Sequence, residues 1–381
     1  MTRCLPRRAV LGILGIAFLV RMAAACYLGD AVTGLSGAQD EVSYSMLGER
    51  FATGHGLTFP TAWYPWIAPN APQSYYSAAM SLYLATIYTV FGFHPLVARV
   101  ITGVLSTLVV LMIILITNRI FGREAAILAG LIASVYAYLI FYGVTLVTET
   151  PFMLAVLGAI YLAYLIVDSP SLARWILLGL ALALATLFRS AVIFFLPALL
   201  WWVIHRQRGQ RLMVVIPIAF IALFLLPFTI RNYMLWHHFL LLESQFGHVF
   251  WNGNYPGQYL SFDPSRAFPI PSDVLASHND AEITDTLLWM GIHNVLSHPD
   301  NFALVTVARL RELFTFWPTS DSTTVANVMR VSSFGILLPF VIAGLALTRR
   351  RWRELFPILS FVVIQTAVYS VTWTMIRYRI P

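Results

Sequence analysis

Long apolar runs recur along this sequence, and they constrain its fold more than any other feature. The chain has 381 residues, of which 59% are hydrophobic and 11% are charged, whereas about a quarter of an average soluble domain is charged. Most of the runs approach the roughly 20 residues that cross a bilayer. We therefore predict an all-α, polytopic membrane protein in which residues 1–381 form a single membrane domain. The runs lie near residues 9–29, 97–117, 124–141, 150–167, 172–188, 190–204, 212–230, 331–348 and 355–375.

The basic residues indicate which ends of these runs share a side of the membrane. All 24 of them are arginine, and the formal net charge is +7. Because positive charge collects in short cytoplasmic loops, we interpret the arginine clusters as an orientation signal and not as a nucleic-acid site. We expect the N-terminus and every cluster to be cytoplasmic, in an inner (plasma) membrane. The clusters lie at 205–211, at 349–353, at Arg119 with Arg123, and at Arg174.

Whether the segment 75–91 crosses the membrane decides on which side every later loop lies. It has the apolar character of a further span, but if it crossed, all of the arginine clusters would lie outside and would violate the charge rule together. Its tyrosines suit the membrane interface, so we predict a helix that lies in or dips into the outer interface. The outward segments are then the first outer loop with its interfacial helices (30–96), the short loop 142–149, the long outer loop 231–330, and 376–381.

Two adjacent acids, Asp40 and Glu41, open a short amphipathic segment (38–56) just after the first apolar run. Asp40 occupies the position of a helix N-cap, where the helix dipole favours an ionised carboxylate. Two interpretations are open at this point. The segment is either a capped interfacial helix without chemistry, or it holds a carboxylate at the rim of a cavity, available as a base or as a metal ligand.

Ionisable groups at other span boundaries lie on the same predicted side. Glu149 precedes Pro151, and an ionisable group at such a boundary costs free energy unless it serves a cavity or is well solvated. It can also merely complement a helix dipole. Arg189 either snorkels to the interface or faces the same cavity. The aromatic, proline-rich loop 60–66 is either a belt at headgroup level or a lid or sugar-stacking wall.

The C-terminal third adds polar segments but no familiar catalytic motif. The histidines of 227–257 are typical of hydrogen-bonded loops, and 301–317 is typical of an interfacial amphipathic helix. Arg377 and Arg379 lie on the outer side, where positive charge is disfavoured, which calls for a functional reason. No HExxH, paired CxxC, GxxxxGK or GxSxG motif occurs, so zincin, P-loop and hydrolase-elbow functions have no support.

Several stretches together resemble the bacterial GT-C glycosyltransferases of the dolichyl-phosphate-mannose protein mannosyltransferase and aminoarabinose (lipid A) transferase kind. No single stretch is specific, but their order along a multispanning chain is. The matching stretches are Asp40-Glu41-x-x-Tyr44, Glu149-Thr150-Pro151, Thr229-Ile230-Arg231-Asn232-Tyr233, Asn252-Gly253-Asn254 and Arg377-Tyr378-Arg379-Ile380-Pro381.

This resemblance implies transfer of a sugar from a polyprenyl-phosphate donor to a glycan, lipid or protein acceptor at the outer membrane face, with inversion. On the matching positions, Asp40 resembles the general base, with Glu41 beside it. Glu149 resembles the acid of the second outer loop that positions the acceptor or a metal. Arg377 and Arg379 would grip the lipid phosphate, since a guanidinium can bind it bidentately.

Further residues are predicted to bind the substrates: Tyr44, Arg189, Arg231, Asn252 and Asn254. A divalent cation could also counter the charge of the leaving phosphate. The sequence shows no dedicated ligand set for one, so the metal ligands are unknown at this point.

The sequence also departs from the family. Relatives that modify lipid A carry a lysine in the first outer loop for the phosphate, whereas this chain has Asn70-Ala71-Pro72-Gln73 and no lysine at all. The family continues for further spans, so we expect C-terminal spans to be missing from the sequence that ends at Pro381. The identities of the sugar and the acceptor cannot be read from these patterns.

Two other classes of protein remain open. A transporter or a flippase for lipid-linked sugars also needs ionisable residues near a cavity. Transporters place such residues near the middle of the bilayer, however, whereas the acids here cluster at loop boundaries on one side, which favours the enzyme. A structural or assembly subunit of a cell-envelope complex would need no such acids.

Overall fold

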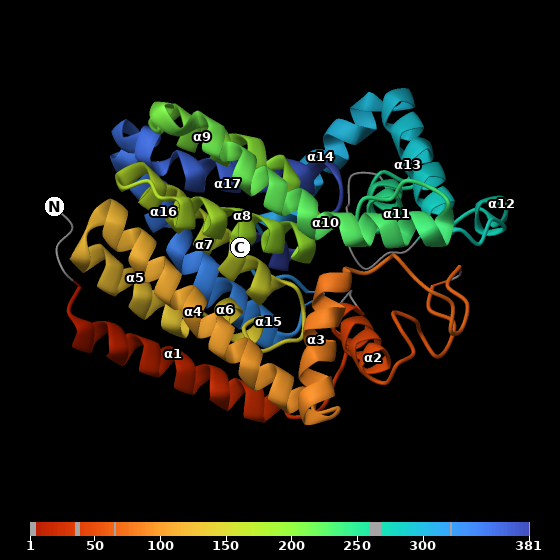
Figure 1. Ribbon diagram of the computed structural model, residues 1–381, viewed down its shortest axis with the longest axis horizontal. Coiled ribbons are helices and arrows are strands. Elements are labelled where there is room, and N and C mark those ends of the chain that lie inside the picture. The colour runs from red at the N-terminus through yellow and green to blue at the C-terminus, as the bar shows by residue number, and fades with distance from the viewer. Residues whose placement is uncertain (1–4, 35–38, 65, 259–267, 321, 381) are drawn as a thin grey trace.

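The computed structural model describes residues 5–34, 39–64, 66–258, 268–320 and 322–380. Position 38 of the opening segment, position 65 of the aromatic loop and Pro381 of the terminal stretch lie outside these residues. The described part of the chain is built of helices (Figure 1), and it contains no β-strand beyond two isolated bridges. The predicted all-α membrane fold is therefore confirmed.

The first half of the chain supplies most of the bundle. Its helices are α1 (Arg7–Leu28), α2 (Asp40–Ala52), α3 (Ala78–Phe91), α4 (Pro95–Phe121), α5 (Arg123–Val135), α6 (Ala137–Phe141), α7 (Glu149–Asp168), α8 (Leu172–Phe188), the short η1 (Ser190–Phe194) and α9 (Leu196–Arg206).

The second half adds two more apolar stretches and the helices of the long outer loop. Its elements are η2 (Arg208–Val214), α10 (Val215–Trp236), α11 (Gln245–Gly253), α12 (Ser272–Leu275), α13 (Asp280–Ser297), α14 (Pro299–Leu313), α15 (Thr324–Met329), η3 (Arg330–Gly335), α16 (Ile336–Thr348), η4 (Arg349–Arg351), α17 (Trp352–Val371) and η5 (Ile376–Arg379).

Five helical stretches of the described chain are long and apolar enough to cross a membrane. They are α1, α4, α7, the stretch Arg208–Trp236 and the stretch Thr324–Val371. The last has 48 residues and contains both predicted C-terminal runs. One run corresponds to α16 and the other to α17, and the short helix η4 lies between them. The helices α3, α8 and the stretch Ser190–Arg206 are apolar but shorter.

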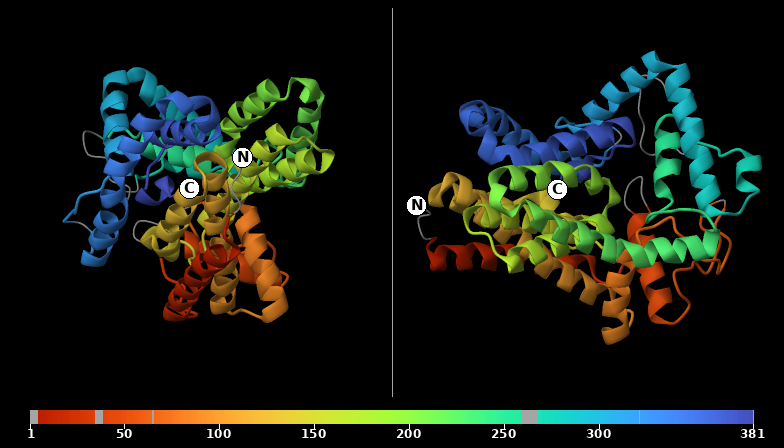
Figure 2. Two further views of the ribbon diagram at one scale, coloured as in Figure 1. Left: turned by 90° about the vertical axis from the view of Figure 1, so that its left-hand side faces the viewer. Right: turned by 45° about the horizontal axis from the view of Figure 1, so that its top comes forward.

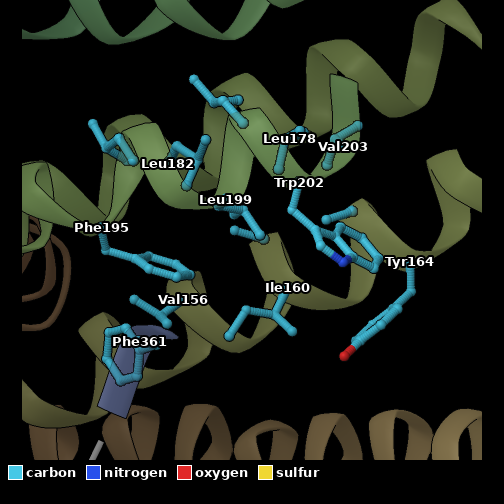
Figure 3. Packing of buried hydrophobic residues seen from close by; sticks show 14 of the residues in the cluster. Val156, Ile160, Tyr164, Leu178, Leu182, Phe195, Leu199, Trp202, Val203 and Phe361 are labelled. Atoms are coloured by element: carbon cyan, nitrogen blue, oxygen red, sulfur yellow. The ribbon is translucent and has the colours of Figure 1, made fainter. Parts of the chain in front are cut away.

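The apolar centre of the bundle is formed by α7, α8, α9 and α17 (Figure 3). Ile160, Leu178, Leu199 and Trp202 are all buried in this cluster. The indole of Trp202 donates a hydrogen bond of 2.9 Å to the Arg353 carbonyl oxygen, so the one polar atom of this large side chain is satisfied. These helices are apolar on most of their circumference, as expected for segments that face protein on one side and lipid on the other.

The predicted run at 124–141 is not one helix but two, and a buried arginine explains how the break is tolerated. Tyr136 adopts an extended conformation between α5 and α6, which frees carbonyl groups in a region without water. The Arg21 guanidinium of α1 donates to the Ser134 oxygen at 3.2 Å and to the Ala133 oxygen at 3.4 Å. Its Nε also donates to Ser106 Oγ at 2.7 Å. Broken helices persist in membranes only where such partners satisfy the freed groups.

The arginine clusters meet at one end of the bundle. Arg119 forms an ion pair with Asp168, and Arg351 donates to the Ile120 carbonyl oxygen at 2.5 Å. Gln207, in the cluster 205–211, donates to the Val167 carbonyl oxygen at 2.7 Å. The predicted grouping of the clusters is therefore present in the fold, and we call this the basic end. Which side of the membrane it faces stays a prediction.

The outer loops meet at the opposite end, where α2 and α3 lie beneath α11, α12 and α13 (Figure 1). The helices α13 and α14 project beyond the bundle (Figure 2). The two loops are joined by hydrogen bonds: Ser74 N–H donates to Asp280 Oδ2 at 2.8 Å, and Ser244 N–H donates to the Ser74 oxygen at 2.8 Å. With 14 residues, α3 is too short to cross roughly 30 Å of hydrocarbon, which agrees with its predicted interfacial position.

Replacing Arg21 with methionine should weaken the bundle, because it leaves the Ala133 and Ser134 carbonyl groups without their donors. We expect a loss of about 2 kcal/mol in the free energy of unfolding, measured as a lower Tm of the detergent-solubilised protein. Arg8→Met, at an exposed position of the same helix, is the matched control and should leave the Tm unchanged. Equal shifts in both variants would contradict this role of Arg21.

The stability of the contact between the two outer loops should depend on pH, because Asp280 forms part of this contact. Burial raises the pKa of Asp280 from 3.8 to about 6, so the folded state retains a proton that the unfolded state has lost. The folded state therefore loses stability as the pH rises from about 4 to about 6, by up to about 3 kcal/mol. Asp280→Asn should remove this dependence in thermal unfolding at pH 4 and pH 7. The exposed Asp273→Asn should retain it, and identical pH profiles for wild type and Asp280→Asn would refute the assignment.

Candidate active site

Four charged residues from distant parts of the chain form one ion network at the outer-loop end of the bundle. Asp40 forms an ion pair with Arg377, and Arg377 Nε lies 3.5 Å from Glu149 Oε1. Arg189 Nη2 donates to the same Glu149 oxygen at 3.0 Å. The network thus joins the start of α2, the start of α7, the end of α8 and the terminal turn η5. The structure brings together four residues that the sequence predicted for one site.

The network is electrically balanced and largely buried. Asp40 and Glu149 are the first residues of their helices, so each carboxylate lies at the positive end of a helix dipole. Arg189 and Arg377 supply two fixed positive charges. The exposed fractions of the side chains are 1% for Glu149 and 5% for Arg377, against 23% for Asp40. Asp40 is therefore the carboxylate of the network that a substrate can reach.

A cavity of about 390 Å³ adjoins the network. Asp40, Tyr44 and Arg189, all predicted from the sequence, line it. Its wall also carries side chains that the sequence analysis did not single out, among them Ser190, Glu243, Tyr369 and Tyr378. Arg189 Nη1 donates to the Tyr369 hydroxyl at 3.3 Å, and its guanidinium lies 4.9 Å from the centre of the Tyr378 ring.

Part of the cavity wall is apolar. Ile193, Phe194, Leu241 and Phe246 line it there, and we call these four residues the apolar rim. Phe194 is 55% exposed and Phe246 is 44% exposed. Large exposed apolar side chains next to a cavity are typical of a site for an apolar ligand or a lipid.

Glu41 points away from this cavity, although it follows Asp40 in the sequence. Its carboxylate lies 2.6 Å from Arg99 Nη1 of α4, and it accepts the Leu146 N–H at 3.3 Å. Successive residues of a helix are about 100° apart, so neighbours in sequence face different surroundings. Burial raises the pKa of Glu41, and the charge of Arg99 opposes this shift. The predicted pairing of Glu41 with Asp40 in one catalytic group therefore does not occur in this structure.

Four other predicted substrate-binding residues lie outside the cavity wall and join loops to one another. Arg231 donates to the Gln73 oxygen at 3.0 Å, and Asn252 accepts the Phe268 N–H at 3.1 Å. Asn254 Oδ1 accepts from Arg309 at 3.0 Å. Arg379 donates to the Thr315 oxygen at 2.6 Å. These contacts make the four residues part of the frame around the site.

The residues that sequence reasoning missed had only weak signals. Glu243 is an acid directly after the apolar run Phe239-Leu240-Leu241-Leu242, and it could have been weighed on that ground. Tyr378 lies within the terminal stretch 377–381, where the charge of the arginines on either side is the stronger signal. Ser190 and Tyr369 carry no pattern of their own, because only the fold brings them to the cavity.

The carboxylates of the site are not arranged for a metal ion. Among the described residues, no group of three or more histidine, cysteine, aspartate or glutamate side chains could hold one. Asp40 and Glu149 each lie against an arginine instead, and these arginines already supply the positive charge that a cation would bring. We therefore assign no step of a reaction to a metal.

Replacing Glu41 with glutamine should destabilise the protein, because the buried Arg99 then loses its counter-charge. Removing one partner of a buried ion pair typically costs about 3–5 kcal/mol. The backbone oxygens that Arg99 also contacts should hold the loss to about 3 kcal/mol, read from the Tm in detergent. Glu49→Gln on the same helix is the control. A Tm unchanged in Glu41→Gln would show that the pair does not support the fold.

Comparisons with known proteins agree with this architecture. Residues 77–236 match the family model described as dolichyl-phosphate-mannose-protein mannosyltransferase. The archaeal oligosaccharyltransferase AglB from Archaeoglobus fulgidus, solved with an inhibitory peptide and a dolichol-phosphate, superposes with a TM-score of 0.58 and 15% identity. That match covers 97% of this chain and 48% of the other. No curated protein matches the sequence significantly.

A second structure of the Archaeoglobus fulgidus oligosaccharyltransferase, in complex with Zn and sulfate, gives a TM-score of 0.55 at 15% identity. It covers 96% of this chain and 47% of that chain. The present chain thus spans about half the length of the enzyme chains it matches, and at this identity the likeness concerns the fold. Over residues 77–236 the chain is thus similar to the dolichyl-phosphate-mannose-protein mannosyltransferase family, and over nearly all of its length its fold is similar to that of an oligosaccharyltransferase.

Proposed function

We propose that this protein is an inverting glycosyltransferase that moves a sugar from a polyprenyl-phosphate donor to a hydroxyl group of a glycan, lipid or protein. The observation that carries the proposal is the position of Asp40. It is the accessible carboxylate of a balanced ion network, and it lies in the wall of a cavity that is lined by both polar and apolar side chains.

In this reaction Asp40 acts as the general base. An attacking hydroxyl is a weak nucleophile, so a carboxylate must accept its proton while the new glycosidic bond forms. The hydroxyl oxygen attacks the anomeric carbon from the face opposite the leaving phosphate, and the bond between that carbon and the phosphate oxygen breaks. Asp40 takes the proton, and the electron pair of the broken bond leaves with the lipid phosphate.

The arginines of the network are suited to the leaving phosphate. Arg377 is buried and is held between Asp40 and Glu149, yet its Nη1 atom has no hydrogen-bond partner within the described residues. Arg377 does not line the cavity, so it would act on a phosphate there through its positive charge, which attracts phosphate more strongly than a neutral donor does. Arg189 lies on the cavity wall itself and can stabilise the charge that develops on the phosphate.

The apolar rim is suited to the polyprenyl chain of the donor. Ile193 and Phe194 lie in η1 between the apolar helices α8 and α9, so a lipid could enter here without leaving an apolar environment. The phosphate would then reach Arg189 in the cavity wall, and the buried Arg377 would add its positive charge. The acceptor would approach Asp40 from the side formed by the outer loops.

The site is proposed to face the outside of an inner (plasma) membrane, with the N-terminus in the cytoplasm. This assignment rests on the basic end, which the charge rule places in the cytoplasm, at the opposite end of the bundle from the ion network. The carboxylates of the network begin their helices and do not lie in mid-span. This position favours the enzyme over a transporter or a flippase for lipid-linked sugars, the alternative from another class.

Replacing Asp40 with asparagine should abolish most of the sugar transfer, since the amide keeps the shape but cannot accept the proton. We expect kcat to fall by about 10²- to 10⁴-fold at similar protein levels. The assay is transfer of radiolabelled sugar from a panel of polyprenyl-phosphate sugars to envelope acceptors in membranes that contain the protein. Glu49→Gln, on the same helix but outside the cavity wall, should keep full activity.

Two outcomes would contradict the proposal. Full transfer by Asp40→Asn would remove the catalytic assignment, and movement of the donor lipid across the membrane without transfer would favour the flippase. Mass spectrometry of envelope glycans and lipids, with and without the gene, then identifies the acceptor.

A further inference from the structure

A serine and a glutamate form a second polar pair in the cavity wall, and the mechanism above does not use it. Glu243 follows α10 in the long outer loop, and its Oε1 accepts the Ser190 hydroxyl at 2.6 Å. Ser190 begins η1, directly after Arg189 of the ion network. Both residues line the cavity together with Asp40. The pair is therefore placed to contact whatever occupies the cavity.

The charge balance of the site argues that Glu243 binds a neutral group. The two arginines of the ion network already face Asp40 and Glu149, and no ion pair of Glu243 is present among the described residues. Burial raises the pKa of Glu243, and the negative charge of Asp40 adds to this shift, while Ser190 and Arg189 oppose it. A carboxyl group that keeps its proton more readily can both donate and accept hydrogen bonds.

The chemistry of the pair excludes some ligands and suits others. Even with its proton, a carboxyl group lacks the positive charge that binds phosphate strongly, so Glu243 does not belong to the phosphate subsite. Sugar hydroxyls are both donors and acceptors, and a planar carboxyl group can bind two neighbouring hydroxyls at once. A site built to hydrogen-bond a substrate hydroxyl also discriminates strongly against molecules that lack it, because its own polar groups would be left unpaired.

The position of the pair favours the donor sugar over the acceptor. The element η1 carries Ser190 at its start and Phe194 of the apolar rim at its end. The loop before α11 likewise carries Leu241 of the rim two residues before Glu243. The pair is therefore close in the chain to residues of the apolar rim, and Ser190 also follows Arg189 of the ion network, as expected for a subsite that a lipid-linked sugar would occupy. The acceptor would come from the opposite side.

We propose that Ser190 and Glu243 form a subsite for hydroxyl groups of the sugar that the lipid phosphate carries, and that Glu243 determines the specificity for this sugar. The inference rests on the proposed function, because it assumes a polyprenyl-phosphate sugar as donor. It goes further in assigning recognition of the sugar to residues that neither take the proton nor hold the phosphate.

A binding experiment separates recognition of the sugar from recognition of the phosphate. The purified protein in lipid nanodiscs is titrated with polyprenyl phosphate and with polyprenyl-phosphate mannose, glucose and galactose. We expect the wild type to bind one of the sugar lipids about tenfold more tightly than bare polyprenyl phosphate. Glu243→Leu should reduce this ratio to between about one and two, with the Kd for bare polyprenyl phosphate changed less than about twofold.

Matched variants make the result interpretable. Glu243→Gln can still donate and accept hydrogen bonds, so it should retain at least about a third of the wild-type ratio and rule out a folding defect as the cause. Glu282→Leu, an exposed acid of α13, is the control and should behave as the wild type. Arg377→Gln should weaken the binding of bare and sugar-bearing lipids alike, which tests the phosphate subsite separately.

Each other outcome overturns the subsite. An unchanged ratio in Glu243→Leu shows that Glu243 does not read the sugar, and an equal loss for bare polyprenyl phosphate shows a structural role. A changed KM for the acceptor with an unchanged donor ratio moves the pair to the acceptor side. A wild type that binds polyprenyl phosphate without preferring any sugar lipid refutes the subsite alone. A wild type that binds neither lipid refutes the proposed function as well.

Discussion

The buried balance between two arginines and two carboxylates is the constraint on which the rest of the site depends. Asp40 and Arg377 are 337 positions apart in the sequence, so the end of the described chain must return to the start of α2 for the charges to meet. A buried charge without its partner is strongly destabilising. The contacts that bring these distant parts of the chain together therefore also hold Asp40 and Arg189 in the cavity wall.

Buried arginines in this chain also connect separate backbone segments through hydrogen bonds. Arg99 joins Gly29, Ala31 and Val144 through their carbonyl oxygens, and Arg309 donates to the oxygens of Ser370 and Gly253. A guanidinium offers five donors in a planar fork, so one side chain can reach several carbonyl groups at once. A lysine ammonium is a compact point charge and cannot span the same distance. This use fits a chain whose 24 basic residues are all arginine.

The sequence predicted those features that the bilayer itself imposes. Span length and the grouping of arginine clusters follow from hydrocarbon thickness and charge, and the fold contains both. The break at Tyr136 was not predictable, because no proline or glycine marks it and the compensating donor, Arg21, lies in another helix. Asp40 and Glu149 could be placed on one side by counting spans. Asp40 faces the cavity and Glu41 faces Arg99 because of the way α2 is rotated about its axis. A single sequence does not reveal this rotation.

The proposed reaction gains a further property from the balance of charges. Arg377 forms an ion pair with Asp40, so the carboxylate that is proposed to take the proton already has a positively charged partner. A donor phosphate in the cavity would compete with Asp40 for the positive charge of Arg377, so it would weaken this ion pair as it binds. The donor would thereby activate the residue that deprotonates its attacker, and the site would remain neutral and inactive until the lipid phosphate arrives. An arrangement with a free carboxylate and a separate phosphate clamp would lack this coupling.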